Sequence, residues 1–352
     1  MLGRQGWAKS INENLSPFRK RIGSVVFSLP EGFDLKTLIR HTIIFTVLVE
    51  IAGIFLLTPL FRAQGVENSL WAAVFHTVSA FCTAGFSIFP NSLEDFRNDF
   101  WINAVISILS MLGAVGFLVA SDVWQSLVKR RRSMTLTTKV ILSFTSFFLI
   151  AGFLLLLFFD TSMQDLPMGE RILSAWFQAM TALTTVGFNT HPIGSLGNFA
   201  ILLTLALMIV GASPSGTGGG IKTTSISAAL GSMWSSLRGS NSTAYMGRRI
   251  PEERVTAAFS AIVFYILVFL IGSGFLLVFQ EQVFEDLIFE AASALGTVGL
   301  SRGITGDLTL AGKWIIIAMM YVGRIGPLSF GMALLYNRSR SFVKMPEEDL
   351  AV

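Results

Sequence analysis

Charged residues, cysteine and histidine are all scarce in this sequence. Only 14% of its 352 residues are Asp, Glu, Lys or Arg, which is too small a share for the charged surface of a soluble protein. The single cysteine, Cys82, excludes an internal disulfide and a cysteine-based metal cage. The three histidines, His41, His76 and His191, are scattered without the spacing of metal ligands. These shortages argue against a soluble domain and against a resident metal site.

Motifs typical of catalysis and of secretion are missing as well. The sequence contains no Gly-x-Ser-x-Gly turn, no His-Glu-x-x-His pair and no paired cysteines, so we expect neither an enzyme nor a bound cofactor. The first forty residues lack the apolar centre of a signal peptide, because their longest apolar run is only Val25–Leu29. The net charge of +4 comes from loops that flank apolar runs and gives no evidence of nucleic-acid binding.

Apolar residues, by contrast, are abundant and gathered into long runs. They make up 52% of the sequence, and six runs are long enough to cross the core of a bilayer, which takes about 20 helical residues. We therefore predict an all-α integral membrane protein with six transmembrane helices. The runs are Leu38–Phe61, Trp101–Val123, Val140–Phe159, Asn198–Leu237, Val255–Phe279 and Lys313–Tyr336.

Lysine and arginine are unevenly distributed between the segments that flank these runs. Seven lie in Met1–Arg40, five in Ser121–Lys139, four in Gly231–Arg254 and three after Tyr336, against five in the opposite loops. Positively charged loops stay on the cytoplasmic side of a membrane. We therefore expect these four segments, with both termini, to be cytoplasmic in a bacterial inner membrane.

Three short segments between the runs repeat one another. Phe75–Ser87, Phe177–Asn189 and Phe289–Ser301 align without gaps, and each lies between two apolar runs. Their helical part is only about ten to fourteen residues long, which is too short to cross a bilayer. We therefore predict three tandem repeats, each made of a span, a re-entrant pore helix and a second span.

Each of these segments ends in Thr, then Ala or Val, then Gly, then Phe or Leu. Glycine permits positive φ and lets backbone carbonyls turn inward, and rings of such carbonyls replace the water shell of an alkali cation. We predict that the three turns form a selectivity filter of the potassium-channel type; three purely structural turns are the alternative. The predicted filter residues are Thr83, Ala84, Gly85, Phe86, Thr185, Val186, Gly187, Phe188, Thr297, Val298, Gly299 and Leu300.

A glycine-rich stretch, Gly211–Lys222, interrupts the fourth apolar run. Unpaired backbone at membrane depth is tolerated only beside protein or water, so the break predicts a constriction next to a pore. The alternative is a kink in the helix that serves packing alone and has no function in transport. A phosphate-binding loop is a poor match, because Ile221 separates the glycines from Lys222 and Thr223 and no strand precedes them.

Together these motifs resemble the Trk/Ktr/HKT superfamily of potassium transporters, most closely the membrane pore subunit of Ktr- and Trk-type uptake systems. The resemblance covers Lys36 to about Arg340 and includes Gly323–Leu328 in the last run. It implies uptake of potassium, or of sodium, as the transported ion. It also implies a homodimer in the membrane that works with a cytoplasmic ring of nucleotide-binding regulatory subunits.

The resemblance has one large departure. Members of the superfamily carry four repeats, whereas the three repeats here match the second, third and fourth. Either the chain is a fragment, or a separate polypeptide supplies the first repeat, or the chain is a non-conducting remnant; the choice between potassium and sodium stays open. The expected division is 1–37 lead-in, 38–123 second repeat, 124–139 basic linker, 140–237 third repeat, 238–254 linker, 255–340 fourth repeat and 341–352 tail.

The resemblance also implies a gate beneath the filter. Arg324 lies about eleven residues into the last run, near the membrane midplane, where a cation beside the pore is an electrostatic barrier; an ion pair with a neighbouring helix is the alternative. Glu290 opens the last pore helix and is expected to accept backbone N–H groups behind the filter. The predicted gate residues are Ser215, Gly216, Thr217, Gly218, Gly219, Gly220, Lys222 and Arg324.

Two other classes of function compete with a pore. A secondary transporter with broken helices would show inverted repeats, whereas all three repeats here begin on the same predicted side of the membrane. A non-transporting membrane scaffold stays open because the first repeat is missing, although the glycines kept in all three Thr-x-Gly turns argue against it. We therefore expect uptake of a monovalent cation.

Overall fold

Most of the predicted lead-in and tail, and the basic run that precedes residue 134, lie outside the described part of the chain. The computed structural model describes residues 35–127, 134–240, 242–326 and 330–331.

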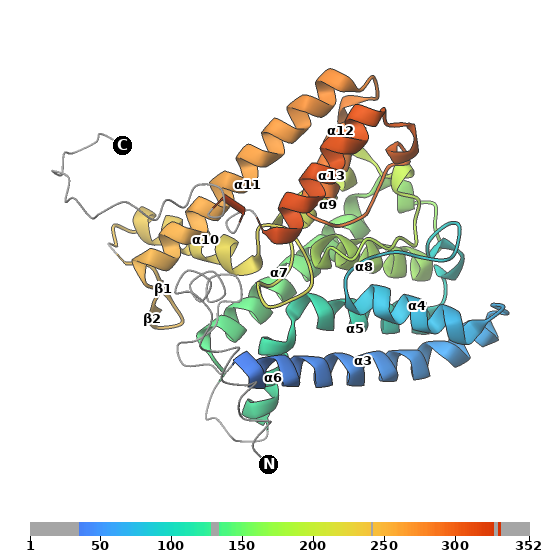
Figure 1. The fold of residues 1–352 in the computed structure, drawn as a ribbon, viewed down its shortest axis with the longest axis horizontal. Coiled ribbons are helices and arrows are strands. Elements are labelled where there is room, and N and C mark those ends of the chain that lie inside the picture. The colour runs from blue at the N-terminus through green and yellow to red at the C-terminus, as the bar shows by residue number, and fades with distance from the viewer. Residues whose placement is uncertain (1–34, 128–133, 241, 327–329, 332–352) are drawn as a thin grey trace, which may run out of the picture.

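The described chain is almost entirely helical, with one short antiparallel hairpin and four short 3-10 helices (Figure 1). The long elements follow the apolar runs of the sequence. The helices are α3 (Leu35–Ala63), α4 (Ser69–Phe81), α5 (Phe100–Val115), α6 (Phe117–Leu127), α7 (Leu136–Phe159), α8 (Met168–Thr184), α9 (Asn198–Val210), α10 (Thr223–Leu237), α11 (Glu252–Phe279), α12 (Phe284–Leu295) and α13 (Leu310–Ile325); the hairpin is β1 (Ala244–Tyr245) with β2 (Arg248–Arg249); the 3-10 helices are η1 (Glu94–Phe96), η2 (Thr161–Met163), η3 (Ile193–Ser195) and η4 (Thr305–Asp307).

Three helices in the described residues, α3, α7 and α11, are long and apolar enough to cross a membrane, and α5 with α6 would form a fourth span. The sequence predicts a span over Trp101–Val123, and the structure divides this run into α5 and α6, which meet at an angle of 97°. Between them Gly116 has a φ of 83°, a left-handed conformation that ends a helix. The run Asn198–Leu237 is divided into α9 and α10, and α13 has 16 residues.

Three short helices, α4, α8 and α12, lie among the longer ones and are largely buried. α4 packs against α3 and α5, α8 against α7 and α9, and α12 against α11 and α13 (Figure 1). With 13, 17 and 12 residues, they are shorter than the roughly 20 residues of a membrane span. We call each short helix, together with the two longer helices that it packs against, a helical unit. α8 also packs on α5, and α12 packs on α9, so each helical unit contacts the next one along the chain.

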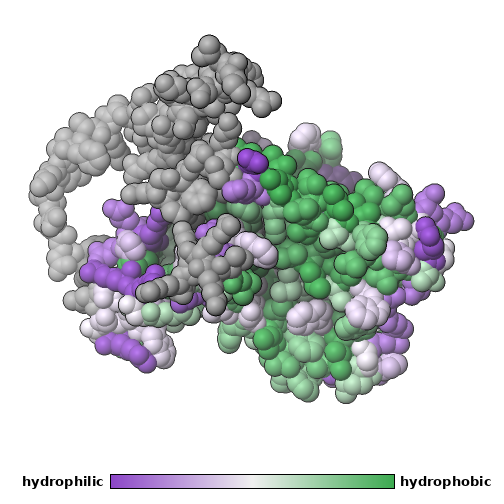
Figure 2. All heavy atoms as spheres, turned by 90° about the horizontal axis from the view of Figure 1, so that it is seen from below, coloured by the Kyte–Doolittle hydropathy of each residue, from purple (hydrophilic) through white to green (hydrophobic). Residues whose placement is uncertain are grey.

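The surface of the molecule is apolar over a wide area. Figure 2 shows a broad hydrophobic surface with hydrophilic residues gathered toward two opposite ends. Phe55 and Val278, on α3 and α11, are 77% and 75% exposed. Soluble monomers rarely expose a contiguous apolar surface of this extent, whereas a surface that faces lipid must. We call the hydrophilic end that carries β1 and β2 the hairpin end.

Candidate functional site

Each short helix is followed at once by a turn with unusual backbone geometry. Thr83, Thr185 and Thr297 have φ angles of 49°, 58° and 50°. A β-branched residue with positive φ is a steric outlier, and it persists only where the surrounding structure holds it in place. Because the outlier occurs at the threonine of all three turns, the conformation belongs to the Thr-x-Gly pattern itself.

The three turns meet at one place in the molecule. A Cβ atom on Gly85 would lie 1.9 Å from the carbonyl oxygen of Val186, and one on Gly187 would lie 2.0 Å from the carbonyl oxygen of Val298. Any side chain at these two glycines would therefore collide with the neighbouring turn. Gly299 of the third turn is not covered by a neighbouring turn, since a Cβ there would meet no atom nearer than 4.0 Å.

Hydrogen bonds from the amides of the turns set the direction of the carbonyl groups. After α8, the N–H groups of Val186 and Gly187 donate back to Thr181, to its carbonyl oxygen at 3.2 Å and to its Oγ1 at 3.1 Å. A trans peptide unit points its C=O away from its N–H. The carbonyls of Thr185 and Val186 consequently point away from α8.

The turns after α12 and α4 follow the same rule. The N–H groups of Val298 and Gly299 donate to Ser293, at 2.8 Å to its carbonyl oxygen and 3.1 Å to its Oγ, and the N–H of Ala84 donates to the carbonyl of Ser79 at 2.8 Å. Carbonyls of the three turns are thus directed away from their own short helices. Convergent backbone carbonyls are the groups that replace the water shell of an alkali cation.

Three side-chain hydroxyls that the sequence did not predict support the turns from behind. Ser79 Oγ donates to the carbonyl of Phe86 at 2.8 Å, and Thr181 Oγ1 donates to that of Phe188 at 2.7 Å. Ser293 Oγ and Thr181 Oγ1 also accept the N–H groups of the filter glycines that follow them. A signal was available, because a Ser or Thr stands four residues after the shared phenylalanine in every aligned segment.

Glu290 lies behind the third turn with a partner different from the predicted one. Its Oε1 accepts the hydroxyl of Thr305, which in turn is 2.8 Å from the Ser301 hydroxyl. The carboxyl group is 5% exposed, and its Oε2 has no hydrogen-bond partner in the described part of the chain. Glu290 therefore ties α12 to the segment after the filter through hydroxyls, and not through the backbone N–H groups expected from the sequence.

The glycine-rich stretch lies directly against the threonines of the three turns. Thr83 Oγ1 donates to Thr217 Oγ1 at 3.1 Å, and the N–H of Gly219 donates to Thr185 Oγ1 at 2.7 Å. A Cβ on Gly219 would lie 2.4 Å from the Oγ1 of Thr297, so the backbone approaches the third turn too closely for a side chain. This loop consequently touches all three filter segments.

Two cations hold the carbonyl groups of the loop. Arg324 donates from its guanidinium to the carbonyl of Thr217 at 2.8 Å, and Lys222 Nζ donates to the carbonyl of Gly218 at 2.5 Å. Within the described residues, Arg324 has no acidic partner, so the alternative of an ion pair with a neighbouring helix is not seen there. Both cations therefore act on the loop itself.

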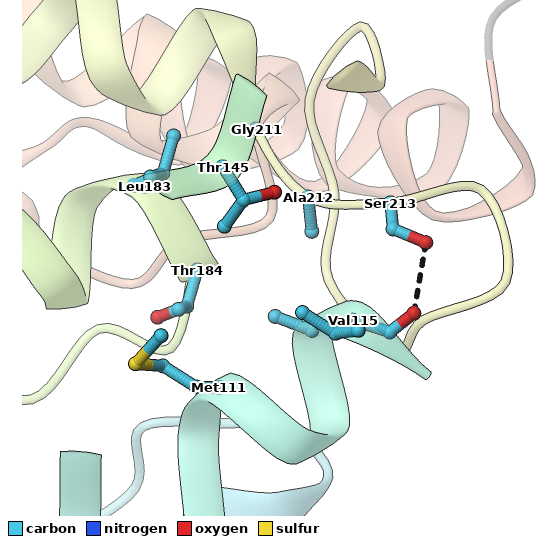
Figure 3. A pocket seen from close by; sticks show the side chains of 9 residues that line it. Met111, Val115, Thr145, Leu183, Thr184, Gly211, Ala212 and Ser213 are labelled. Atoms are coloured by element: carbon cyan, nitrogen blue, oxygen red, sulfur yellow. Dashed lines mark hydrogen bonds between the residues drawn. The ribbon is translucent and has the colours of Figure 1, made fainter. Parts of the chain in front are cut away.

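The start of the loop is packed against α5, α7 and α8. Ser213 donates to the carbonyl of Val115 at 2.9 Å, and Ser215 donates to the same carbonyl at 3.1 Å. Figure 3 shows Ser213 and Val115 beside a cavity of about 10 Å³ that Thr145 and Thr184 also line. That volume holds about one water molecule, so the loop has almost no free space on this side.

Beyond the filter, the segment after the second turn is tied to the first helical unit. Asn189 donates to Glu94 at 2.7 Å, and Arg97 donates to the carbonyl of Thr190 at 2.7 Å. His191 is buried beside them, and burial, together with the Arg97 charge, lowers the pKa of its imidazole, while Asp160 opposes that shift. In the described residues no three His, Cys, Asp or Glu side chains are grouped as a metal site would require.

The predicted site residues thus fall into one region, with differences between the repeats. Phe86 is 70% exposed, whereas Phe188 and Leu300, at the same position in the other turns, are buried. Ser215 and Gly216 contact the end of α5 instead of the filter.

Comparisons with known proteins agree with the predicted resemblance. The sequence pattern of the family described as TrkH, cation transport protein, matches residues 31–339. The chain is 35% identical over 318 residues to the Ktr system potassium uptake protein B of Bacillus subtilis, which covers 89% of this chain and 71% of that protein. It is 32% identical over 334 residues to the potassium/sodium uptake protein NtpJ of Enterococcus hirae, covering 92% and 73% of the two chains.

The fold has a solved counterpart. The crystal structure of the potassium transporter TrkH from Vibrio parahaemolyticus superposes with a TM-score of 0.70 at 19% identity, over 90% of this chain and 69% of that chain. At this identity the likeness concerns the fold alone.

Proposed function

Because the chain belongs to the TrkH family of cation transport proteins, we propose that this multi-pass membrane protein takes up potassium ions. It is not an enzyme, since the family is one of transporters. The observation that carries the proposal is the convergence of three Thr-x-Gly turns whose carbonyls point away from their own short helices. Sodium is a second possible cargo, as the name of the NtpJ relative indicates for that protein.

In this proposal the three turns strip water from the ion and coordinate it. Oxygens of Thr83, Thr185, Val186, Thr297 and Val298 supply the ligands, while the flanking filter residues set their spacing. The hydroxyls behind the turns keep the oxygens in place. Selectivity between potassium and sodium then depends on how rigidly the turns are held.

The gate is the loop that contains Ser215–Gly220, with Lys222 and Arg324. The loop is bonded to the filter threonines, so an ion leaving the filter must displace it. The two cations retain the loop through its carbonyls and add positive charge to the path of the ion. Opening requires the loop and Arg324 to move together.

The remaining proposals concern assembly. We assign residues 38–123, 140–237 and 255–340 to three successive repeats, and we propose that a fourth Thr-x-Gly turn adjoins Gly299 in the working pore. The open side of Gly299 supports this, because the other two glycines are closed by a neighbouring turn. A homodimer with a separate cytoplasmic ring of nucleotide-binding regulatory subunits completes the system that the family resemblance suggests.

Complementation of growth tests the function. The chain would be expressed in bacteria that lack their own potassium uptake systems, alone and as a chimera behind the first repeat of the Bacillus subtilis relative. We expect growth at low potassium and rubidium uptake from at least one of the two forms. Normal amounts of both proteins in the membrane without any uptake would instead favour a non-transporting scaffold.

A further inference from the structure

A cavity of about 380 Å³ lies between α7, α10 and α11, outside the ion pathway described above. Its volume is within the range of about 300–1,000 Å³ that is typical of small-molecule sites. Part of its lining is polar and includes Thr137, Thr224, Ser225 and the exposed Arg254. No Asp or Glu is among the described residues that line the cavity.

Arg254 is free to bind a ligand. Its neighbour Arg249 also lines the cavity but is already paired with Glu252 at 2.7 Å. Arg254 is exposed and has no ion-pair partner among the residues that the structure describes. A guanidinium presents two parallel N–H donors that match the oxygens of a phosphate group.

Three helices begin at this cavity. α7 starts at Leu136 and α11 at Glu252, and α10 starts at Thr223, one residue before the cavity wall. The first turn of a helix has N–H groups without intrahelical acceptors and carries a partial positive charge. A carboxylate already lies at two of these starts: Asp122 accepts the N–H of Thr135 just before α7, and Glu252 and Glu253 stand in the first turn of α11. The first turn of α10 contains no acidic residue, so its start reinforces the charge of Arg254, and this side of the cavity favours an anion.

Another part of the cavity wall is apolar. Val140 of α7 and the small side chains of Ala258 and Ala261 of α11 contribute to it. Hydrocarbon would cover this wall, whereas a small hydrophilic anion would leave it wet. A ligand with both an anionic head and a hydrocarbon part suits both parts of the wall.

We propose that this cavity binds the phosphate-ester headgroup of an anionic phospholipid, with Arg254 as its main contact. Basic pockets between membrane helices bind such headgroups in general. A soluble phosphate compound shares the headgroup chemistry but would not use the apolar wall. Because α10 starts directly after Lys222, a bound lipid would also restrict the movement of the end of the proposed gate loop. Only this last consequence rests on the proposed function.

Lipid binding by the purified full chain tests the site without any transport measurement. Delipidated protein in detergent would be titrated with phosphatidylglycerol, phosphatidylcholine and inorganic phosphate, and bound lipid would be counted by native mass spectrometry alongside thermal unfolding. We expect phosphatidylglycerol to bind and to raise the unfolding temperature. Arg254→Gln should weaken the binding of phosphatidylglycerol by about tenfold, because it removes one charge-assisted hydrogen-bond pair.

Two further variants separate the contributions. Arg248→Gln removes a neighbouring exposed arginine that does not line the cavity, so its affinity for phosphatidylglycerol should equal that of the wild type. Ala261→Leu fills the apolar wall and should weaken the binding of the lipid but not of inorganic phosphate. Equal loss in Arg248→Gln and Arg254→Gln would overturn the site, as would equal affinity of wild type and Arg254→Gln. Inorganic phosphate that binds as tightly as the lipid, with no effect of Ala261→Leu, would overturn the lipid assignment and leave a phosphate site.

Discussion

At the scale of single residues, the hydroxyl of Thr181 is the best-placed support of the filter. It accepts the N–H of Gly187 and donates to the carbonyl of Phe188, and it is fully buried. Thr181→Val keeps the shape of the side chain but leaves both backbone groups without their hydroxyl partner. Each unpaired group should lower the free energy of unfolding by about 1–3 kcal/mol. We expect a lower unfolding temperature and a potassium/sodium uptake ratio that falls severalfold.

Thr204 offers a matched control for this substitution. It is also a fully buried threonine, on α9, but its hydroxyl has no hydrogen-bond partner in the described residues. Thr204→Val should leave the uptake ratio unchanged and should not destabilise the protein. If both variants lost selectivity equally, the hydroxyl of Thr181 would have no special role in positioning the filter.

The filter glycines Gly187 and Gly299 should respond unequally to substitution. Serine at position 187 would force its Cβ against the carbonyl of Val298, and serine at position 299 would meet open space but keep a strained φ of 95°. We expect Gly187→Ser to abolish most uptake, and Gly299→Ser to retain uptake with weaker discrimination against sodium. Rubidium and sodium fluxes of the two variants measure this difference.

Gly303 provides the control, because its φ of 99° is similar and it has no atom within 4 Å of a built Cβ. Gly303→Ser should therefore show only the cost of backbone strain and transport with normal selectivity. Identical defects at positions 187, 299 and 303 would mean that strain alone, and not the filter oxygens, explains the effect.

At the scale of elements, the loop between α9 and α10 should behave as a retained plug. Deleting Ser215–Gly220 removes its contacts with the filter threonines and should raise flux while reducing its dependence on any regulatory subunit. Arg324→Ala frees the Thr217 carbonyl and also removes a positive charge from the ion path, so it should raise flux as well. Isotope uptake in proteoliposomes, at matched protein amounts, measures both changes.

Arg324→Lys separates the two effects of this arginine. Lysine keeps the charge but loses the planar fork, so flux should rise less than in Arg324→Ala if the charge is the barrier. Equal flux in the two variants would assign the effect to the lost hydrogen bond. If ion flux were unchanged or lower in both the deletion variant and Arg324→Ala, the loop would be a packing kink and not a gate.

The sequence predicted the elements whose signals recur and missed those that depend on distant partners. The three Thr-x-Gly turns were readable because the same residues stand in three aligned segments. The bend at Gly116 was not, since one glycine in an apolar run is common and its meaning comes from the left-handed φ it adopts. The partner of Glu290 was also missed, because Thr305 lies beyond the filter and nothing local relates the two residues.

At the scale of the whole molecule, charge and apolar surface together define how the protein sits in a membrane. The hairpin end carries Arg248 and Arg249, whereas the loop between α4 and α5 carries Glu94, Asp95 and Asp99. The apolar surface of Figure 2 lies between the hydrophilic ends. From the positive-inside rule we predict that the hairpin end is cytoplasmic and that the acidic loop is outside.

Single cysteines at exposed positions test this orientation. In a Cys82→Ser background, Arg248→Cys marks the hairpin, and Asp95→Cys and Asp307→Cys mark two loops predicted to be outside; all three positions are exposed. A membrane-impermeant maleimide added to intact cells should label positions 95 and 307 at once and position 248 only after permeabilisation, because the reagent cannot cross the bilayer. The reverse pattern would invert the orientation and with it the direction of the proposed gate. Labelling of all three positions in intact cells, with the membrane shown to be sealed, would mean that the helices between them do not separate the two ends across the bilayer.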